Sequence, residues 1–354
     1  MSFVENTWYM AMWAQDLKDT PVARRIINRP LVLFRRPQGQ PVALADACPH
    51  RFAPLHMGTI MGGGSIRCAY HGLQFDTSGA CVHNPHPSGR IPPLAKVRPY
   101  PVVEKHTMLW VWMGEREPNL DDIPDFSIVD RADPALSAKR DFVRIGANYV
   151  LITENLLDLS HAAFLHEGVL GNADTLNGKI VVEQDGDTIW VRRSMPNVRI
   201  PGLYDLLFRR DGGRVDMWAD IRWNNPGCLL HDSGVKQPGG ERSSGTGIFG
   251  IHILTPESEQ STVYHFFAIR QNPLTAGAEA DETIRNRLSE LRRHAFVELD
   301  FPMIEAQHRM MNDPSVDTSR PALFEIDIGP ARFQRRLTEL LKSEGSMAGS
   351  DASR

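Results

Sequence analysis

Two short stretches decide how this sequence is interpreted: CPHRFAPL (residues 48–55) and CAYHGLQF (residues 68–75). The first contains Cys48 and His50, and the second contains Cys68 and His71. Each pair follows a run typical of a short strand. The spacing therefore predicts two loops, each with one thiol and one imidazole, that converge on a single metal centre.

The distribution of Cys and His between the two loops distinguishes a zinc site from an iron–sulfur cluster. Zinc fingers usually pair a Cys with a nearby Cys and a His with a nearby His, whereas each of these loops supplies one of each. In a Rieske 2Fe–2S centre two Cys bind one iron and two His bind the other. The motifs therefore predict a Rieske cluster, and a zinc site is the alternative that stays open.

The other thiols and histidines near these loops follow no ligand pattern. Cys81 and Cys228 have no ligand-like neighbours, which predicts buried free thiols. His56, His83 and His86 lie close to the motifs in sequence, but the cluster does not need them. We interpret these three as loop or surface histidines.

A second group of polar residues occurs in YVLITENLLDLSHAAFLHEG (residues 149–168). A helix over Leu151–His166 places Asn155, Asp158, His161 and His166 on roughly one side and at its end. Two imidazoles and a distant carboxylate form a 2-His-1-carboxylate face with positions open for oxygen. Asp158 is the expected partner that orients the His161 ring. Two satisfied or exposed histidines are the alternative.

The carboxylate of that face is predicted from VELDFPMIEAQ (residues 297–307). Apolar residues at three- and four-residue spacing predict a helix over Asp281–Met311, and Pro302 predicts a kink or break near Asp300. A helix that bends there can carry Asp300 toward a cavity. Glu298 and Glu305 are the competing candidates.

Length and composition describe an ordinary globular protein. The 354 residues are 42% hydrophobic and carry a formal charge of −4, which suggests about two domains and excludes a strongly basic nucleic-acid binder. No apolar run is long enough to span a bilayer, no signal peptide is recognisable, and four Cys are too few for a disulfide scaffold. We expect a cytoplasmic protein without nucleic-acid or membrane partners.

Turn-forming residues divide the chain. The sequence predicts a β-rich domain over 1–118, a linker over 119–130, a second domain over 131–340 and a disordered tail over 341–354. The expected strands are Leu31–Arg36, Val42–Ala45, Met108–Gly114, Thr188–Arg193, Asp216–Trp223, Gly247–Leu254 and Thr262–Arg270.

Together with NTWY, NLLDLSHAAFLH, DIRWN and HILTPESE, these motifs resemble the oxygenase components of Rieske non-haem iron oxygenases over about residues 1–340. Within that family the chain is similar to the vanillate and dicamba O-demethylase branch. The resemblance implies an α+β protein. An N-terminal all-β Rieske domain would precede a catalytic domain with an antiparallel sheet flanked by helices, of the helix-grip type.

The resemblance also implies roles for particular residues. The cluster ligands would be Cys48, His50, Cys68 and His71, and the ligands of one mononuclear Fe(II) would be His161, His166 and Asp300. Asp158 would link His71 of a neighbouring subunit in a homotrimer to His161, and Asn155 would lie near the iron. His231 and His252 would line the substrate site, where a His can hold a carboxylate or sulfonate; packed or solvent-facing histidines are the alternative there.

The implied reaction uses O2 and electrons from a separate NAD(P)H-dependent reductase with flavin and a ferredoxin-type centre. It oxidises a methoxy or methyl group of an aromatic acid, and O-demethylation with release of formaldehyde is the leading expectation. A methyl or ring hydroxylase acting on a sulfonated or chlorinated aromatic is one alternative. A Rieske electron carrier without enzymatic activity is the other.

Overall fold

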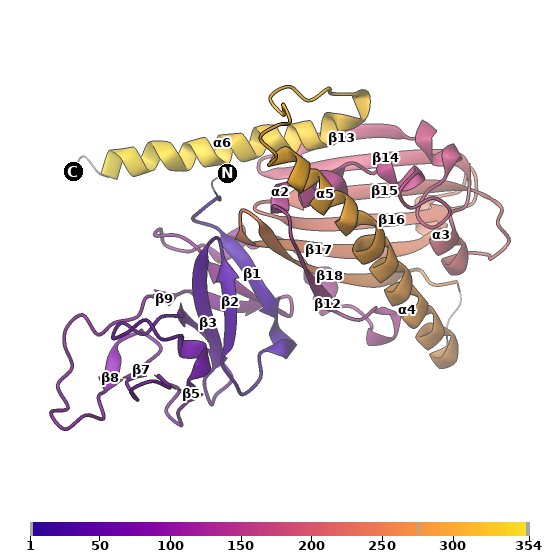
Figure 1. Ribbon diagram of the computed structural model, residues 1–354. Helices are drawn as coiled ribbons and strands as arrows, with labels where there is room; N and C mark the ends of the chain where they lie inside the picture. Colours follow the sequence, from indigo (N-terminus) through magenta and orange to yellow (C-terminus); the bar gives the residue numbers. More distant parts are fainter. Residues whose placement is uncertain (1–2, 275–276, 352–354) are drawn as a thin grey trace. The chain divides into compact units, whose positions relative to one another are not determined.

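The computed structural model describes residues 3–274 and 277–351, which form two compact units (Figure 1). One unit comprises Phe3–Asp125 together with Thr255–Glu259, and the other comprises Phe126–Leu254 and the chain from Gln260 onward. The change of unit after Asp125 falls inside the segment 119–130 that the sequence suggests as a linker. The inclusion of Thr255–Glu259 in the N-terminal unit has no signal in the sequence.

The N-terminal unit consists of short strands in three sheets, with the orders β1-β11-β10, β2-β3-β4-β9 and β5-β6-β7-β8. Strands β1 (Trp8–Trp13) and β11 (Met108–Trp112) are buried at every residue and pair antiparallel, because aromatic and aliphatic side chains fill both of their faces. The other strands are β2 (Val22–Ile26), β3 (Arg29–Arg35), β4 (Pro41–Ala45), β5 (Thr59–Ile60), β6 (Ile66–Arg67), β7 (Gln74–Phe75), β8 (Cys81–His83), β9 (Pro99–Tyr100) and β10 (Val102–Lys105).

The C-terminal unit is built on a seven-stranded sheet of order β12-β18-β17-β16-β15-β14-β13. Its strands form an antiparallel meander in which, for example, His231 of β16 lies opposite Gly250 of β17. The strands are β12 (Asp141–Ile145), β13 (Lys179–Asp185), β14 (Thr188–Arg199), β15 (Arg214–Asn224), β16 (Cys228–Lys236), β17 (Thr246–Ser258) and β18 (Ser261–Gln271). The strands expected in this half lie within β14, β15, β17 and β18, which are longer than predicted.

Helices cover one face of this sheet, and Figure 1 shows α4 and α5 as one long run across it. Helix α4 packs Ile284 and Leu288 against Met217 of β15 and Val235 of β16. Because these apolar residues follow helical spacing, they close the core between helix and sheet. The helices are α1 (Ser127–Asp130), α2 (Tyr149–Leu157), α3 (Gly202–Leu207), α4 (Ala278–Arg293), α5 (Phe301–Met311) and α6 (Ile328–Asp351).

The helix expected over Leu151–His166 is shorter in the structure, so that prediction was wrong in its C-terminal half. Helix α2 ends at Leu157, and the Asp158 carboxylate accepts a hydrogen bond from the Ser160 N–H at 3.0 Å. Asp and Ser side chains compete in this way with the helical hydrogen-bond pattern. The chain continues as a short 3₁₀ turn at His161–Ala163 and an irregular segment.

The long helix expected over Asp281–Met311 is interrupted as predicted, but by a π-helical segment, His294–Asp300, between α4 and α5. Pro302 occupies the first turn of α5, where its missing N–H is tolerated. π-Helical bulges are frequent at functional sites, and this one ends on Asp300.

The C-terminal tail also differs from the expectation of disorder over 341–354. Helix α6 extends to Asp351, and residues 352–354 lie outside the described residues. The helix is anchored near its start by Phe333, whose buried ring packs on Trp223 with a centroid distance of 5.1 Å. Among the described residues, no helix is long and apolar enough to cross a membrane.

Candidate active site and cluster site

The two cysteine–histidine loops have the same backbone conformation. The Phe52 N–H donates to the Cys48 carbonyl at 2.8 Å, and the Gly72 N–H donates to the Cys68 carbonyl at 3.1 Å. Each cysteine N–H also donates to the carbonyl five residues later, at 2.9 and 2.8 Å. The fifth residue of each loop has a positive φ, +57° at Phe52 and +74° at Gly72. Glycine adopts this conformation freely, whereas a phenylalanine there costs about 1–2 kcal/mol.

The loops bring the four predicted cluster residues together in two layers. Cys48 and Cys68 are each 2% exposed and belong to one buried apolar cluster of the N-terminal unit. Burial, with a contribution from the neighbouring Cys68 thiol, raises the pKa of the Cys48 thiol to about 11. The rings of His50, which is exposed, and His71, which is half-buried, lie 4.6 Å apart. A pair of thiols behind a pair of imidazoles matches the ligand division of a Rieske cluster.

The neighbouring thiols and histidines are placed mostly as expected. Cys228 is buried, and burial raises its pKa to about 12. Cys81 is only half-buried, so the prediction of a buried thiol was wrong there; it lies on β8, at the edge of its sheet. His83 and His86 are exposed, whereas His56 bonds through Nδ1 to the buried Asp46 carboxylate at 2.5 Å. The ring of His86 lies 6.2 Å from that of His71.

The end of α2 positions the first part of a second site. Asn155 lies in the last turn of α2, and Asp158 caps the helix. The His161 ring is oriented through Nδ1 by the main-chain carbonyl of Asp158. We expected the Asp158 side chain to hold this ring; its carboxylate instead accepts hydrogen bonds from the N–H and hydroxyl of Ser160.

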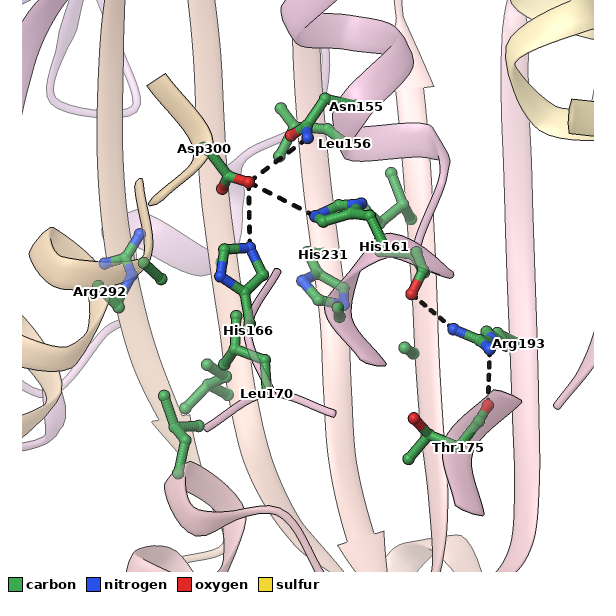
Figure 2. Close-up of a pocket in the computed structure, with 18 of the residues that line it drawn as sticks. Asn155, Leu156, His161, His166, Leu170, Thr175, Arg193, His231, Arg292 and Asp300 are labelled. Atoms are coloured by element: carbon green, nitrogen blue, oxygen red, sulfur yellow. Dashed lines mark hydrogen bonds and ion pairs between the residues drawn. The ribbon is translucent and has the colours of Figure 1, made fainter. Parts of the chain in front are cut away.

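Three side chains from distant parts of the sequence converge here (Figure 2). The Asp300 Oδ1 atom lies 3.0 Å from His166 Nε2, 3.6 Å from His161 Nε2 and 3.4 Å from Asn155 Nδ2. One ligand atom from each of His161, His166 and Asp300 falls within 4.8 Å of the others. His166 and Asp300 are buried, whereas the His161 side chain is 22% exposed. This is the donor set of a 2-His-1-carboxylate iron site.

The two competing carboxylates lie elsewhere. Glu298 has a side chain that is 64% exposed and contacts His294 Nδ1 at 2.5 Å. Glu305 accepts a hydrogen bond from the Gly146 N–H at 2.8 Å. Of the three acidic residues considered, only Asp300 lies beside the two histidines.

A cavity of about 90 Å³ lies beside this group. Its walls come from α2, the sheet and the α4–α5 run, and most of the lining is aliphatic. His231 and His252, the two candidates for a substrate site, both line it. The His252 Nδ1 atom is 2.5 Å from the Tyr264 hydroxyl oxygen, whereas the buried His231 Nε2 has no hydrogen-bond partner in the described structure.

Comparisons with known proteins agree with this geometry. The model of the Rieske [2Fe–2S] domain matches residues 7–101, and the model of the vanillate O-demethylase oxygenase C-terminal domain matches residues 145–343. The oxygenase component of dicamba O-demethylase from Stenotrophomonas maltophilia is 36% identical, over 98% of this chain and 100% of that protein.

The oxygenase component of chloroacetanilide N-alkylformylase from Rhizorhabdus wittichii is 34% identical, over 97% of each chain. The chain belongs to the Rieske non-haem iron oxygenases. It is the oxygenase component of a Rieske monooxygenase.

The crystal structure of dicamba monooxygenase bound to 3,6-dichlorosalicylic acid superimposes on this oxygenase with a TM-score of 0.90. The two chains are 34% identical, and the match covers 98% of this chain and 99% of the other. The fold is therefore the predicted one, an all-β Rieske domain followed by a catalytic domain with an antiparallel sheet and helices. The cofactors are a Rieske 2Fe–2S cluster and a mononuclear non-haem iron.

Some residues of the cavity were missed from the sequence. Arg292 and Phe296 lie about two turns and one turn before Asp300, respectively, and both line the cavity. Arg292 stands four residues after Leu288 and three before Ala295, on the apolar side of the helix. A charged residue on the apolar face of the expected helix is the sequence feature that could have identified Arg292. No local pattern identifies Arg193, which reaches the cavity from β14.

Proposed function

We propose that this oxygenase removes the methyl group of a methoxy substituent on an aromatic acid and releases formaldehyde. The observation that carries the proposal is the convergence of His161, His166 and Asp300 on the wall of a cavity with a largely apolar lining. The proposal is supported by the family model named for vanillate O-demethylase and by a relative named as a dicamba O-demethylase.

We assign the cluster to Cys48, His50, Cys68 and His71, and the mononuclear iron to His161, His166 and Asp300. The iron that these three residues would hold would supply the activation of O2 and the oxidation of a carbon–hydrogen bond of the methoxy group. The overall reaction converts ArOCH3, O2, two electrons and two protons into ArOH, formaldehyde and water. The protein supplies ligand geometry, hydrogen bonds and a cavity of low polarity.

The residues around the ligands keep this geometry. The Asp158 carbonyl fixes the His161 ring with Nε2 directed toward Asp300, so that Nε2 is the atom available to a metal. Asn155 donates to Asp300 Oδ1 and restrains the carboxylate. Leu156 and Phe296 contribute apolar walls, which exclude water from the reacting carbon and favour the flat face of a ring.

Electrons would reach the iron from the cluster of a neighbouring subunit. The imidazole edges of His50 and His71 face outward, whereas His166 and Asp300 are buried. We propose a homotrimer in which His71 of one chain meets the half-buried Asp158 carboxylate of the next, and the adjoining residue His161 completes the path. The exposed edge of His50 is then available to a reductase with flavin and a ferredoxin-type centre.

We place the protein in the cytoplasm, where NAD(P)H-dependent reductases obtain their reductant. The four cysteines are consistent with that compartment, because all of them are free thiols in the structure.

The function is tested by incubating anaerobically purified oxygenase with a ferredoxin-type reductase, NADH, O2 and a panel of methoxybenzoic acids. We expect phenol and formaldehyde in equal amounts, with a matching consumption of O2. Hydroxylated products without formaldehyde would identify a methyl or ring hydroxylase instead. An intact cluster that cycles electrons without any organic product, in wild type and His161→Ala alike, would identify an electron carrier.

A further inference from the structure

The cavity is lined by a buried cation, Arg292, that makes no ion pair among the described residues; the Asp141 carboxylate of β12 acts on it only electrostatically. Arg292, at the end of α4, is 5% exposed, and its Nη2 atom has no hydrogen-bond partner in the described structure. Its guanidinium lies over the rings of Phe266 and Phe296, at 5.3 and 5.7 Å from their centroids. Contacts with ring faces offset only part of the cost of removing a cation from water.

Other buried arginines of this unit are better paired. The Arg270 Nη1 atom lies 2.6 Å from an oxygen of Asp281. Arg193 lines the same cavity, but its two terminal nitrogens donate to main-chain carbonyls at 2.5 and 2.6 Å. Arg292 differs from both, because its Nη2 atom has no hydrogen bond and the Asp141 carboxylate acts on it without an ion pair.

The lining of the cavity offers no counterion to Arg292. Asp300 is the one carboxylate among the described lining residues, and His161 and His166 already contact it. Figure 2 shows Arg292 on the same helical run as Asp300, among the side chains that line the cavity. An anion that entered the cavity would therefore meet a guanidinium that no carboxylate of the lining contacts.

The two histidines of the cavity cannot supply the same attraction. Burial lowers the pKa of His231 to about 4 and that of His252 well below its ordinary value, so both rings are neutral at pH 7. Burial also lowers the pKa of Arg292, but only to about 10, so the guanidinium remains charged. The histidines can donate or accept single hydrogen bonds, whereas Arg292 can bind two oxygens of an oxyanion at once.

We propose that Arg292 binds the anionic group of the aromatic substrate, a carboxylate or a sulfonate, and thereby makes the oxygenase selective for aromatic acids over uncharged analogues. This inference rests on the proposed function for the location of the reacting carbon. The inference adds that Arg292 is the residue by which the oxygenase distinguishes charged from uncharged substrates. Phe296, one turn after Arg292, contacts both the guanidinium and the His252 ring, so it lies where the substrate ring would pack.

The test measures binding, so that it does not depend on turnover. The 2-, 3- and 4-methoxybenzoates and 4-methoxybenzenesulfonate are titrated calorimetrically into anaerobic holoenzyme, each beside its uncharged primary amide. We expect at least one acid to bind about 10- to 100-fold more tightly than its amide. In Arg292→Gln that preference falls to less than about threefold, and Arg292→Lys keeps part of it, because a lysine offers the charge without the planar fork.

Arg293→Gln is the matched control. It removes the same charge at the next position of the chain, where the side chain is 57% exposed and lies 3.5 Å from Asp141 Oδ2. We expect it to keep the preference of the wild type. Acids and amides that bind equally to the wild type, or a preference that survives in Arg292→Gln, would overturn the inference. Formaldehyde release from neutral methoxyarenes without a preference for acids would do so while leaving the O-demethylation reaction of the proposed function intact.

A thermal measurement separates substrate recognition from a structural role. If Arg292 is kept for the substrate, Arg292→Met without ligand has an equal or higher Tm than the wild type, because a buried charge without a direct ion pair is removed. The acid that binds the wild type raises the Tm of the wild type but not that of the variant. A lower Tm in Arg292→Met, with the same stabilisation by the acid, would show that the guanidinium serves packing alone.

Discussion

The cysteine–histidine loops and the His161–His166–Asp300 group differ in where they present their polar atoms. In the loops the thiols are buried and the imidazole edges face outward. In the second group the buried ligands converge on a cavity, and the surrounding walls are apolar. The first arrangement suits exchange of electrons with another protein surface, whereas the second suits chemistry on a small molecule away from water.

The two groups also differ in how they are assembled. Each loop is held by its own pair of main-chain hydrogen bonds. The cluster site is therefore built from two loops, each with its own local structure. The second group joins the segment after α2 to a residue 134 positions further along the chain, at the end of a π-helical segment. Changes to the loops should therefore affect the cluster alone, and changes to the second group should affect the iron and the cavity alone.

The largest effect is expected from removing one ligand at each site. His161→Ala abolishes formaldehyde release while the visible spectrum of the cluster is unchanged, because its ligands lie in the other unit. Cys68→Ser abolishes turnover together with that spectrum. Glu298→Gln, an exposed neighbour of Asp300, is the control and keeps turnover within about twofold. Loss of the cluster spectrum in His161→Ala would contradict the separation of the two sites.

Removal of the negative charge of Asp158 should have the next largest effect. Asp158→Asn keeps the main-chain carbonyl that orients His161 but removes the carboxylate of the proposed electron path. We expect turnover to fall about 10- to 100-fold while the iron content is kept.

Ser160→Ala serves as the control for Asp158→Asn, because it deletes one hydrogen bond to the same carboxylate and retains the charge. Its turnover should fall much less. Normal turnover in Asp158→Asn, measured as formaldehyde release at saturating reductase, would remove Asp158 from the path.

A methyl group added at a glycine should have different effects in the cavity wall and in the loop that contains Gly63. A Cβ at Gly250 would lie 2.6 Å from His252 Nε2, so Gly250→Ala displaces this ring and its bond to Tyr264. We expect a destabilisation of about 1–3 kcal/mol in chemical unfolding, and a higher KM with the iron retained. Gly63→Ala, in open space between the two cysteine loops, should change neither quantity. Equal effects at both positions would contradict the packing of the cavity.

The smallest effect concerns the two thiols that lie outside the ligand sets. Burial raises the pKa of both thiols, so their exposure decides the difference: in the folded holoenzyme at pH 8 we expect the half-buried Cys81 to react with an aromatic disulfide reagent and the buried Cys228 to stay unmodified. Cys81→Ser should abolish the fast phase without changing turnover, and Cys228→Ser should leave the fast phase intact. A fast phase that persists in Cys81→Ser would place the reactive thiol in the cluster loops.

The sequence predicted the cluster loops better than the His161–His166–Asp300 group. The cluster residues were evident because both pairs of ligands are close in sequence and the loops repeat one motif. Asp300 could be singled out only weakly by Pro302 and then by resemblance, because a contact across 134 residues leaves no local pattern. The extent of α2 was wrong because Asp158 and Ser160 bond to each other rather than continue the helix. Arg292 was missed because spacing alone suggested a core helix face.

The most direct test of two separate iron centres is the iron and acid-labile sulfide content of anaerobically purified protein, measured for the wild type and Asp300→Ala. We predict about three irons and two sulfides per chain with a Rieske absorption spectrum in the wild type. In Asp300→Ala we predict about two irons with the same sulfide content and the same spectrum. Equal iron in both proteins, or a wild type that holds zinc and no sulfide, would contradict the account.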